Sequence, residues 1–341
     1  MSRLKGVFQY VLILGITAFL IWFSLRNLTL SGGEGTFSEK WEYLVQTWNN
    51  AEKNWLFAMA ALAVVSFIIR SERWRMLIQP SGHKPSLASS FLSLMVGYLV
   101  NLVIPRGGEI SRCYNLYKLS NTPVEVSFGT VVIERIVDLI CLVALLFIAF
   151  ILESEKLLGF VESLPIGTGN TRQSVLLYLC LFIIFFTALF FWLFKTNKKV
   201  KAFVVKTWSG FKTGLLSIFK LERKGLFILY SLSIWVLYFL MSYTVIMAFP
   251  QTSHLGISGV LSLFAIGTIA MAAPLPGGTG SYHVLVPQGL VFLYGVPSAD
   301  AVAFTFIFHG WQTAIMIVGG AISLIVTSFV IRNKTSLLKN N

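Results

Sequence analysis

Residues 101–112 read NLVIPRGGEISR, and residues 273–283 read APLPGGTGSYH. Each stretch ends a long apolar run with a proline and a Gly-Gly pair, and a further helical pattern follows it. Proline lacks the N–H group that a helix needs, and glycine adopts backbone angles that other residues avoid, so both stretches are predicted to break a helix. Broken helices inside a membrane leave backbone groups unsatisfied unless they line a cavity. A matched pair of breaks therefore indicates a binding site of the kind that transporters have.

The composition predicts an all-α, polytopic integral membrane protein. The chain has 341 residues, of which 56% are hydrophobic and 12% are charged. Several apolar runs reach the length of about 20 residues that a helix needs to cross a bilayer. The net charge of +13 does not predict nucleic-acid binding, because the basic residues gather in loops and at helix ends. Cys113, Cys141 and Cys180 are widely spaced, so we expect no disulfide framework, metal or cofactor.

Six runs are predicted to span the membrane, at residues 7–25, 55–69, 126–152, 175–194, 225–248 and 299–331. The first is long for a signal peptide and lacks a small-residue cleavage site, so we expect it to be retained. Two pairs of segments flank the breaks, 86–104 with 109–119 and 257–273 with 280–294. Their second arms would be only about 16 and about 22 Å long, less than a hydrocarbon core of roughly 30 Å. Both pairs are therefore predicted to be re-entrant hairpins.

Basic residues predict the orientation. Residues 195–224 hold nine basic residues against one acid, and Arg70, Arg73, Arg75 and Lys84 follow the second span. The loops at 26–53 and 153–173 together hold five basic and seven acidic residues. We therefore expect a protein of the cell inner (cytoplasmic) membrane with both termini in the cytoplasm. The first hairpin then enters from the cytoplasm and the second from outside.

The order helix, helix, hairpin, helix occurs twice, which predicts two inverted repeats. Pro105 and Pro276 are 171 residues apart, and the second spans begin 170 residues apart. The predicted domains are a first membrane repeat at 1–153, a second, inverted repeat at 174–331 and a cytoplasmic tail at 332–341. Within the second repeat, residues 195–224 carry a basic amphipathic pattern that predicts an interfacial helix over 198–221. For the repeat, the alternative interpretation is gene duplication in a structural membrane protein. For residues 198–221, the alternative is a simple connector on the membrane surface.

Five ionisable residues are predicted to form one polar cluster at the first break: Arg106, Glu109, Glu134, Arg135 and Asp138. Charges at membrane depth mark either function or ion pairs that brace helices, and both interpretations stay open. Glu134 and Asp138 are four residues apart and share a helix face. Two positive and three negative charges leave one negative charge in excess, which Arg112, a proton or a cationic headgroup would balance. Arg106 and Arg112 also suit a lipid phosphate.

The second break offers a different chemistry. Gly277, Gly278 and Gly280 leave N–H groups before a helix start, which suits an anion, although glycines also serve close packing. His283 is either a ligand contact or a hydrogen-bonded core residue. Ser281 with a histidine would make an intramembrane serine hydrolase, but no G-x-S-x-G motif is present. We therefore expect no catalytic residues.

Several motifs together resemble the transmembrane region of lysylphosphatidylglycerol synthases. They are Arg73-Trp74-Arg75-Met76-Leu77, Gly97 with Asn101, Pro105-Arg106-Gly107-Gly108-Glu109 with Arg112, Glu134-Arg135 with Asp138, and Pro276-Gly277-Gly278-Thr279-Gly280. The resemblance covers nearly the whole chain. It implies a flippase-like region, which in bifunctional members moves a modified phospholipid to the outer leaflet beside a soluble aminoacyl-transferase domain. Because the chain ends at Asn341, we expect it to lack that domain and the synthesis it performs.

The sequence thus predicts a lipid-sized cavity between the hairpins and the translocation of a membrane phospholipid or lipid-linked substrate. The predicted substrate contacts are Asn101, Arg106, Glu109, Arg112, Glu134, Arg135, Asp138, Gly277, Gly278, Gly280 and His283. The headgroup would bind at the breaks while the acyl chains stay in lipid. The alternatives are a non-transporting lipid-binding partner of an envelope-synthesis enzyme and, less expected, the serine hydrolase. Assembly into a homo-oligomer stays open.

Overall fold

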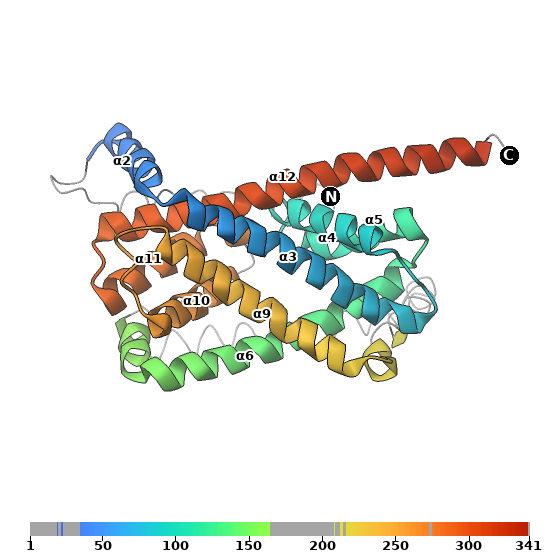
Figure 1. The fold of residues 1–341 in the computed structure, drawn as a ribbon, viewed down its shortest axis with the longest axis horizontal. Helices are drawn as coiled ribbons and strands as arrows, with labels where there is room; N and C mark the ends of the chain where they lie inside the picture. Colours follow the sequence, from blue (N-terminus) through green and yellow to red (C-terminus); the bar gives the residue numbers. More distant parts are fainter. Residues whose placement is uncertain are drawn as a thin grey trace, which may run out of the picture.

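The computed structural model describes residues 35–163, 216–272 and 275–339, together with Phe19, Trp22, Trp208, Lys212 and Thr213. Every element within these residues is a helix (Figure 1), so the all-α prediction is confirmed. The predicted spans at 7–25 and 175–194 lie outside the described residues. So does most of the predicted interfacial helix, of which Leu216–Lys220 forms the short 3-10 helix η2.

Four of the described helices are long and apolar enough to cross a membrane. They are α3 (Lys53–Ile78), α6 (Val124–Ser163), α9 (Lys224–Met247) and α12 (Ser298–Lys339). Large apolar side chains cover their outer faces: Ile140, Phe147 and Ile151 of α6 are 63%, 64% and 62% exposed. In water such a surface would aggregate, whereas in a bilayer it faces the lipid tails.

Two hairpins of shorter helices complete the bundle. The first joins α4 (Leu87–Asn101) to α5 (Gly107–Ser120), and the second joins α10 (Ile257–Ala272) to α11 (Ser281–Tyr294). Helices of 14 to 16 residues are about 21–24 Å long, which is less than the hydrocarbon core of roughly 30 Å. Both predicted helix breaks are therefore present, with arms too short to span.

The hairpins open toward opposite ends of the bundle. The Glu52 N–H group donates to the Ala248 carbonyl at 2.8 Å, so α3 begins where α9 ends. At the other end of α3, the 3-10 helix η1 (Gln79–Ser81) contacts η2, which precedes α9. The first hairpin follows η1 and the second follows α9, so they start from opposite ends (Figure 1). Inverted repeats require this arrangement, although the repeats and the cytoplasmic end remain predictions.

Each hairpin packs on a long helix from the other half of the chain. Helix α4 contacts α12, and α10 contacts α6, while α3 and α9 pack against each other between them (Figure 1). A Cβ added at Gly320 of α12 would lie 2.6 Å from Leu99 Cβ. Small residues of this kind let helix backbones approach closely inside membranes. The packing therefore brings the tips of both hairpins to the middle of the helix bundle.

The structure adds one helix that the sequence analysis did not predict, α2 (Phe37–Asn50). A capping box begins it, in which Thr36 N–H donates to Glu39 Oε2 at 2.6 Å. The backbone hydrogen bond of Thr36 lowers the pKa of Glu39. Tyr43 donates its hydroxyl proton to Asp300 Oδ1 at 2.6 Å, which ties α2 to the start of α12. Burial, followed by this bond, raises the pKa of Tyr43.

Candidate functional site

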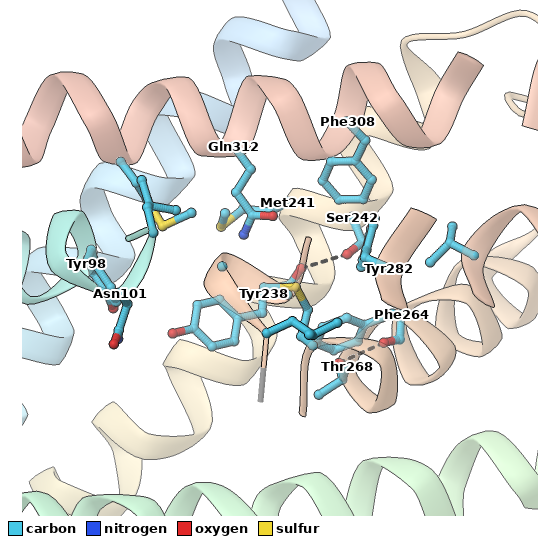
Figure 2. A pocket seen from close by; sticks show the side chains of 18 of the residues that line it. Tyr98, Asn101, Tyr238, Met241, Ser242, Phe264, Thr268, Tyr282, Phe308 and Gln312 are labelled. Atoms are coloured by element: carbon cyan, nitrogen blue, oxygen red, sulfur yellow. Dashed lines mark hydrogen bonds between the residues drawn. The ribbon is translucent and has the colours of Figure 1, made fainter. Parts of the chain in front are cut away.

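A cavity of about 350 Å³ lies between the tips of the two hairpins. Leu102 of the first break and Gly277 of the second both line it, and a Cβ added at Gly277 would lie 2.9 Å from Leu102 Cδ2. Figure 2 shows Asn101 of α4 on one side of the cavity and Phe264 of α10 on the other. The volume is at the small end of the range for ligand sites. It therefore suits a headgroup rather than a whole lipid.

Charged and apolar residues of the lining come from different elements. The charged ones belong to α3, the first hairpin and α6, and they are Arg70, Arg106, Glu109 and Arg135. The second hairpin and the start of α12 contribute mainly apolar side chains, among them Leu263, Phe264, Val286, Phe304 and Phe308. One part of the cavity can thus hold a charged group while the rest holds an apolar one.

Glu134 of α6 is the centre of an arginine network behind the charged lining. Its side chain is fully buried. Arg70 donates to Glu134 Oε1 through Nη2 at 2.8 Å and Nε at 3.1 Å, while Arg112 Nη2 lies 3.3 Å from Oε2. Arg73 Nη2 lies 3.7 Å from Oε1. Three guanidinium groups therefore offset a carboxylate whose burial alone would be very costly.

Asp138, one turn after Glu134, extends the network toward α3. Arg73 Nη2 donates to Asp138 Oδ1 at 2.7 Å, and Arg70 Nη2 lies 3.4 Å from Oδ2. The two carboxylates share one face of α6, as their spacing predicts. The arginines are spaced by three residues on the facing helix, so each can reach both acids. This double pairing fixes α3 against α6.

Arg112 joins the first hairpin to the same network. Its guanidinium carbon lies 4.7 Å from the centre of the Trp74 ring, and Trp74 Nε1 donates to Thr130 Oγ1 at 3.0 Å. Arg112 is 2% exposed, and it is not among the residues that line the cavity. A cation over a buried aromatic ring is stabilised further. Arg112 therefore braces α5 against α3 and α6.

Arg135 lines the cavity and has weaker partners than the other arginines of the network. Its side chain is 40% exposed, and its nearest carboxylate oxygens are Glu109 Oε1 at 3.5 Å and Asp138 Oδ2 at 3.7 Å. Arg135 Nε and Glu109 Oε2 are both buried without a hydrogen-bond partner. Buried polar atoms are nearly always satisfied, so exceptions need an explanation. Arg135 is therefore the network arginine whose charge the neighbouring acids offset least.

The sign of the charge excess differs from the sequence-based expectation. Two further arginines of α3 belong to the network, and Arg112 belongs to it as well. The connected set has four arginines, Arg70, Arg73, Arg112 and Arg135, and three acids, Glu109, Glu134 and Asp138. Four positive and three negative charges leave one positive charge in excess. Arg112, one of the three partners considered for the predicted negative excess, pairs with Glu134, and the addition of Arg70 and Arg73 makes the excess positive.

The first break is built on a close approach of α4 and α5. Gly108 N–H donates to Asn101 Oδ1 at 2.7 Å. A Cβ added at Gly108 would overlap the backbone carbonyl oxygen of Gly97, so the position requires glycine. Arg106 has a left-handed conformation with φ 61°, which costs a residue with a side chain about 1–2 kcal/mol. Strain of this kind concentrates at functional sites, and Arg106 lines the cavity.

Neutral groups hold the second break. His309 of α12 donates from Nε2 to the Gly277 carbonyl at 3.0 Å, because a carbonyl can only accept. Gly280 N–H donates to His283 Nδ1 at 3.3 Å, and Gly278 N–H donates to the Leu275 carbonyl at 3.1 Å. These two N–H groups are therefore engaged within the hairpin and are not open to an anion.

Ser281 is the first residue of α11, and its hydroxyl bonds within the hairpin. It donates to the Ala270 carbonyl at 2.7 Å, and the Gly278 carbonyl lies 3.2 Å away. Both partners are backbone acceptors that the break would otherwise leave open. Ser281 thus joins the arms of the second hairpin. Among the described residues, no three His, Cys, Asp or Glu side chains converge as metal ligands.

The predicted site residues divide between the cavity and its surroundings. Those that line it are Asn101, Arg106, Glu109, Arg135, Gly277 and Gly278, whereas Arg112, Glu134, Asp138, Gly280 and His283 do not. The sequence analysis missed Arg70 and Arg73, which it placed in a loop after a span ending at residue 69. That boundary is wrong, because α3 continues to Ile78. The spacing of these arginines, matched to two acids on α6, was the available signal.

The fold and the cavity define a membrane protein of several spans with a charged site enclosed among its helices. Residues 8–320 match the sequence model of the lysylphosphatidylglycerol synthase TM region, and the chain belongs to this family. No solved structure matches the chain.

Three named relatives are similar to parts of the chain. UPF0104 membrane protein MJ1595 of Methanocaldococcus jannaschii is 28% identical over 46% of this chain and 46% of its own length. UPF0104 membrane protein MJ1078 of the same organism is 26% identical over 60% of this chain and 81% of its own. Glycosyltransferase AglD of Haloferax volcanii is 23% identical over 83% of this chain and 50% of its own. The matches thus span about half the length of the first and third relatives.

Proposed function

We propose that this protein moves the headgroup of a phospholipid or lipid-linked molecule across the cytoplasmic membrane, as a carrier and without covalent chemistry. The observation that carries the proposal is the cavity itself, with three arginines and one glutamate in its lining, between hairpins that start from opposite ends. A charge at the centre of a bilayer costs at least about 2.5–3.5 kcal/mol. A cavity with opposite charges and hydrogen-bond partners lowers that cost for a headgroup in transit.

The acyl chains would stay outside. The cavity is too small for a whole lipid, and the outer faces of the long helices are apolar. A headgroup would therefore enter with its first methylene groups against the second hairpin, while the tails follow in the hydrocarbon core. In this proposal the two hairpins take turns in opening the cavity, one toward each leaflet.

Family membership supports the class of substrate. The family is named for the membrane region of proteins that synthesise a modified phospholipid, and a relative is named as a glycosyltransferase. Both names concern chemistry at membranes, and neither says what this chain moves. The proposal keeps the predicted cytoplasmic location of both termini.

Transbilayer movement in liposomes tests the proposal. The protein is reconstituted with a phospholipid that carries a fluorophore at the end of one short acyl chain. Dithionite, which quenches the fluorophore from outside, reports the fraction of this lipid in the outer leaflet. We expect faster movement than in protein-free liposomes. Arg135→Gln should slow it about tenfold or more, because a hydrogen bond to a charged group contributes about 1.5–3 kcal/mol.

Arg332→Gln is the matched control, since Arg332 is an exposed arginine on the distal part of α12. It removes the same charge and should leave the rate unchanged. Saturable lipid binding with no movement above the protein-free rate would contradict the proposal. That result would favour a lipid-binding partner of an envelope-synthesis enzyme.

A further inference from the structure

Building on the proposed function, we infer that the cavity selects an anionic, phosphate-bearing headgroup over a cationic one. Among the residues that the structure describes, the connected network of four arginines and three acids leaves one positive charge in excess. Arg106 also lines the cavity, but the excess does not depend on it. An excess charge inside a membrane is stabilised by an opposite one, and guanidinium matches phosphate geometrically.

The excess is accessible at Arg135. Glu134 faces Arg70, Arg73 and Arg112, so its charge is already offset by buried partners. Arg135 contacts carboxylate oxygens only at 3.5 and 3.7 Å, beyond the usual range for a charged hydrogen bond. Its side chain is 40% exposed, whereas those of the other three network arginines are at most 7% exposed. Arg135 is therefore the network arginine that is placed to bind a phosphate from the cavity.

Hydrogen-bond donors surround the same place. Arg70 Nη1 donates to the Tyr238 hydroxyl at 2.7 Å, so the Tyr238 proton remains for another acceptor. Asn101 uses Oδ1 to accept from Gly108 N–H, which leaves its Nδ2 as a donor. Both side chains line the cavity. Three kinds of donor, guanidinium, phenol and amide, thus line the cavity that a phosphate would enter.

A cationic headgroup would meet the opposite situation. Of the described residues that line the cavity, Glu109 is the one carboxylate, and it already faces Arg135 at 3.5 Å. An ammonium group would add a second uncompensated positive charge beside Arg70 and Arg135. Glu109 Oε2 is buried without a hydrogen-bond partner, and it would accept from a neutral hydroxyl of the headgroup once the side chain turns toward the cavity. The cavity therefore suits a phosphate with a hydroxyl-bearing substituent better than an aminoacylated lipid.

Binding to the purified full-length chain in an uncharged detergent tests this inference. The probes are dihexanoyl-phosphatidylglycerol, dihexanoyl-phosphatidylcholine and a dihexanoyl trimethylammonium lipid, measured by calorimetry. We expect the anionic lipid to bind at least tenfold more tightly than the cationic one, with the zwitterionic one between them. Glycerol phosphate should compete weakly; binding as tight as that of the lipid would overturn the lipid assignment.

Arg135→Gln should reduce the anionic preference to about threefold or less, whereas Arg332→Gln should keep it. The melting temperature shows whether each variant is folded. If Arg135→Gln does not fold, the wild-type preference alone decides. Equal or tighter binding of the cationic lipid, no binding of the anionic lipid, or an unchanged preference in folded Arg135→Gln would each overturn the inference. Selective binding without lipid movement would instead contradict only the proposed transport.

Discussion

The first hairpin turns between α4 and α5 through Pro105, Arg106 and Gly107, and the second turns between α10 and α11 through Pro276, Gly277 and Gly278. Their arms have 15 and 14 residues in one case and 16 and 14 in the other. Both turns contain left-handed residues at the cavity. The hairpins therefore have arms of similar length, but the backbones of their breaks differ. Arg106 has a positive φ in the first break, whereas Gly277, Gly278 and Gly280 have one in the second.

Their chemistry differs. The first break carries two arginines and a glutamate and joins a network of buried ion pairs, whereas histidine, serine and backbone groups hold the second. Two hairpins with arms of similar length but different side chains form a cavity that is charged toward the first hairpin and mainly apolar toward the second. The comparison teaches that shape provides the cavity and that side-chain asymmetry decides what it holds.

Removing the central charge of the network beside the first hairpin, which is Glu134 of α6, should have the largest effect. Glu134→Gln leaves Arg70, Arg73 and Arg112 with one carboxylate fewer, so we expect the free energy of unfolding to fall by about 3–5 kcal/mol. Unfolding in mixed micelles measures it. Glu72→Gln is the control, because its pair with Arg75 lies near the surface and should contribute about 0–1 kcal/mol. Similar losses in both variants would contradict a special role for Glu134.

A glycine substitution tests how tightly the backbone of the first break is packed. Gly108→Ala places a Cβ against the Gly97 carbonyl oxygen, which belongs to the backbone of a neighbouring helix and cannot move alone. We expect a loss of about 1–3 kcal/mol and slower lipid movement. Gly310→Ala is the control, because an added Cβ there meets no atom within 4 Å. A stability of Gly108→Ala equal to that of the wild type would show that the first break is loosely packed.

Substitution and chemical labelling of Ser281 distinguish a carrier from a serine hydrolase. Ser281→Ala removes a hydrogen bond to the Ala270 carbonyl, so the free energy of unfolding should fall by about 0.5–1.5 kcal/mol. An activated phosphonate should not label the wild-type protein, since this hydroxyl serves the hairpin. Mass spectrometry after incubation measures labelling. Stoichiometric modification that disappears in Ser281→Ala would make the second hairpin catalytic and contradict the carrier proposal.

Substitution of Glu109 should have the smallest effect, which is a change in the relative affinity for two anionic lipids. Dihexanoyl-phosphatidylglycerol should bind about 2- to 10-fold more tightly than dihexanoyl-phosphatidylmethanol, because its hydroxyl can donate to Glu109 Oε2. Calorimetry on the wild type and on Glu109→Gln measures the difference. The preference should shrink in the variant. Equal affinities in the wild type would leave Glu109 Oε2 without the proposed partner.

The sequence predicted the spans and breaks that the structure describes because both depend on local patterns. Apolar runs mark α6, α9 and α12, and the Pro-Gly-Gly stretches mark the hairpin tips. Helix α2 was missed although Thr36 and Glu39 show a capping-box spacing. Its helix is amphipathic and short, and the search was directed at long apolar runs.

The arginine network was only half predictable. Glu134 and Asp138 stand out within an apolar helix, so their importance was evident from the sequence. Arg70 and Arg73 follow an apolar run, where basic residues usually mark a cytoplasmic loop. Their burial depends on acids 64 and 65 residues away in the chain, and no local pattern encodes that pairing. The sign of the excess charge therefore required the structure.

Photocrosslinking at the first hairpin tests the central claim most directly, which is that a lipid headgroup occupies the cavity. A photoreactive phenylalanine analogue replaces Tyr98, which lines the cavity, or Tyr114, which is 54% exposed on α5. The protein is irradiated in vesicles of mixed anionic and zwitterionic phospholipids, and mass spectrometry identifies the adducts. The account predicts adducts at Tyr98 that are enriched in the anionic lipid, and adducts at Tyr114 that follow the vesicle composition. Absence of lipid at Tyr98, or the same composition at both positions, would contradict it.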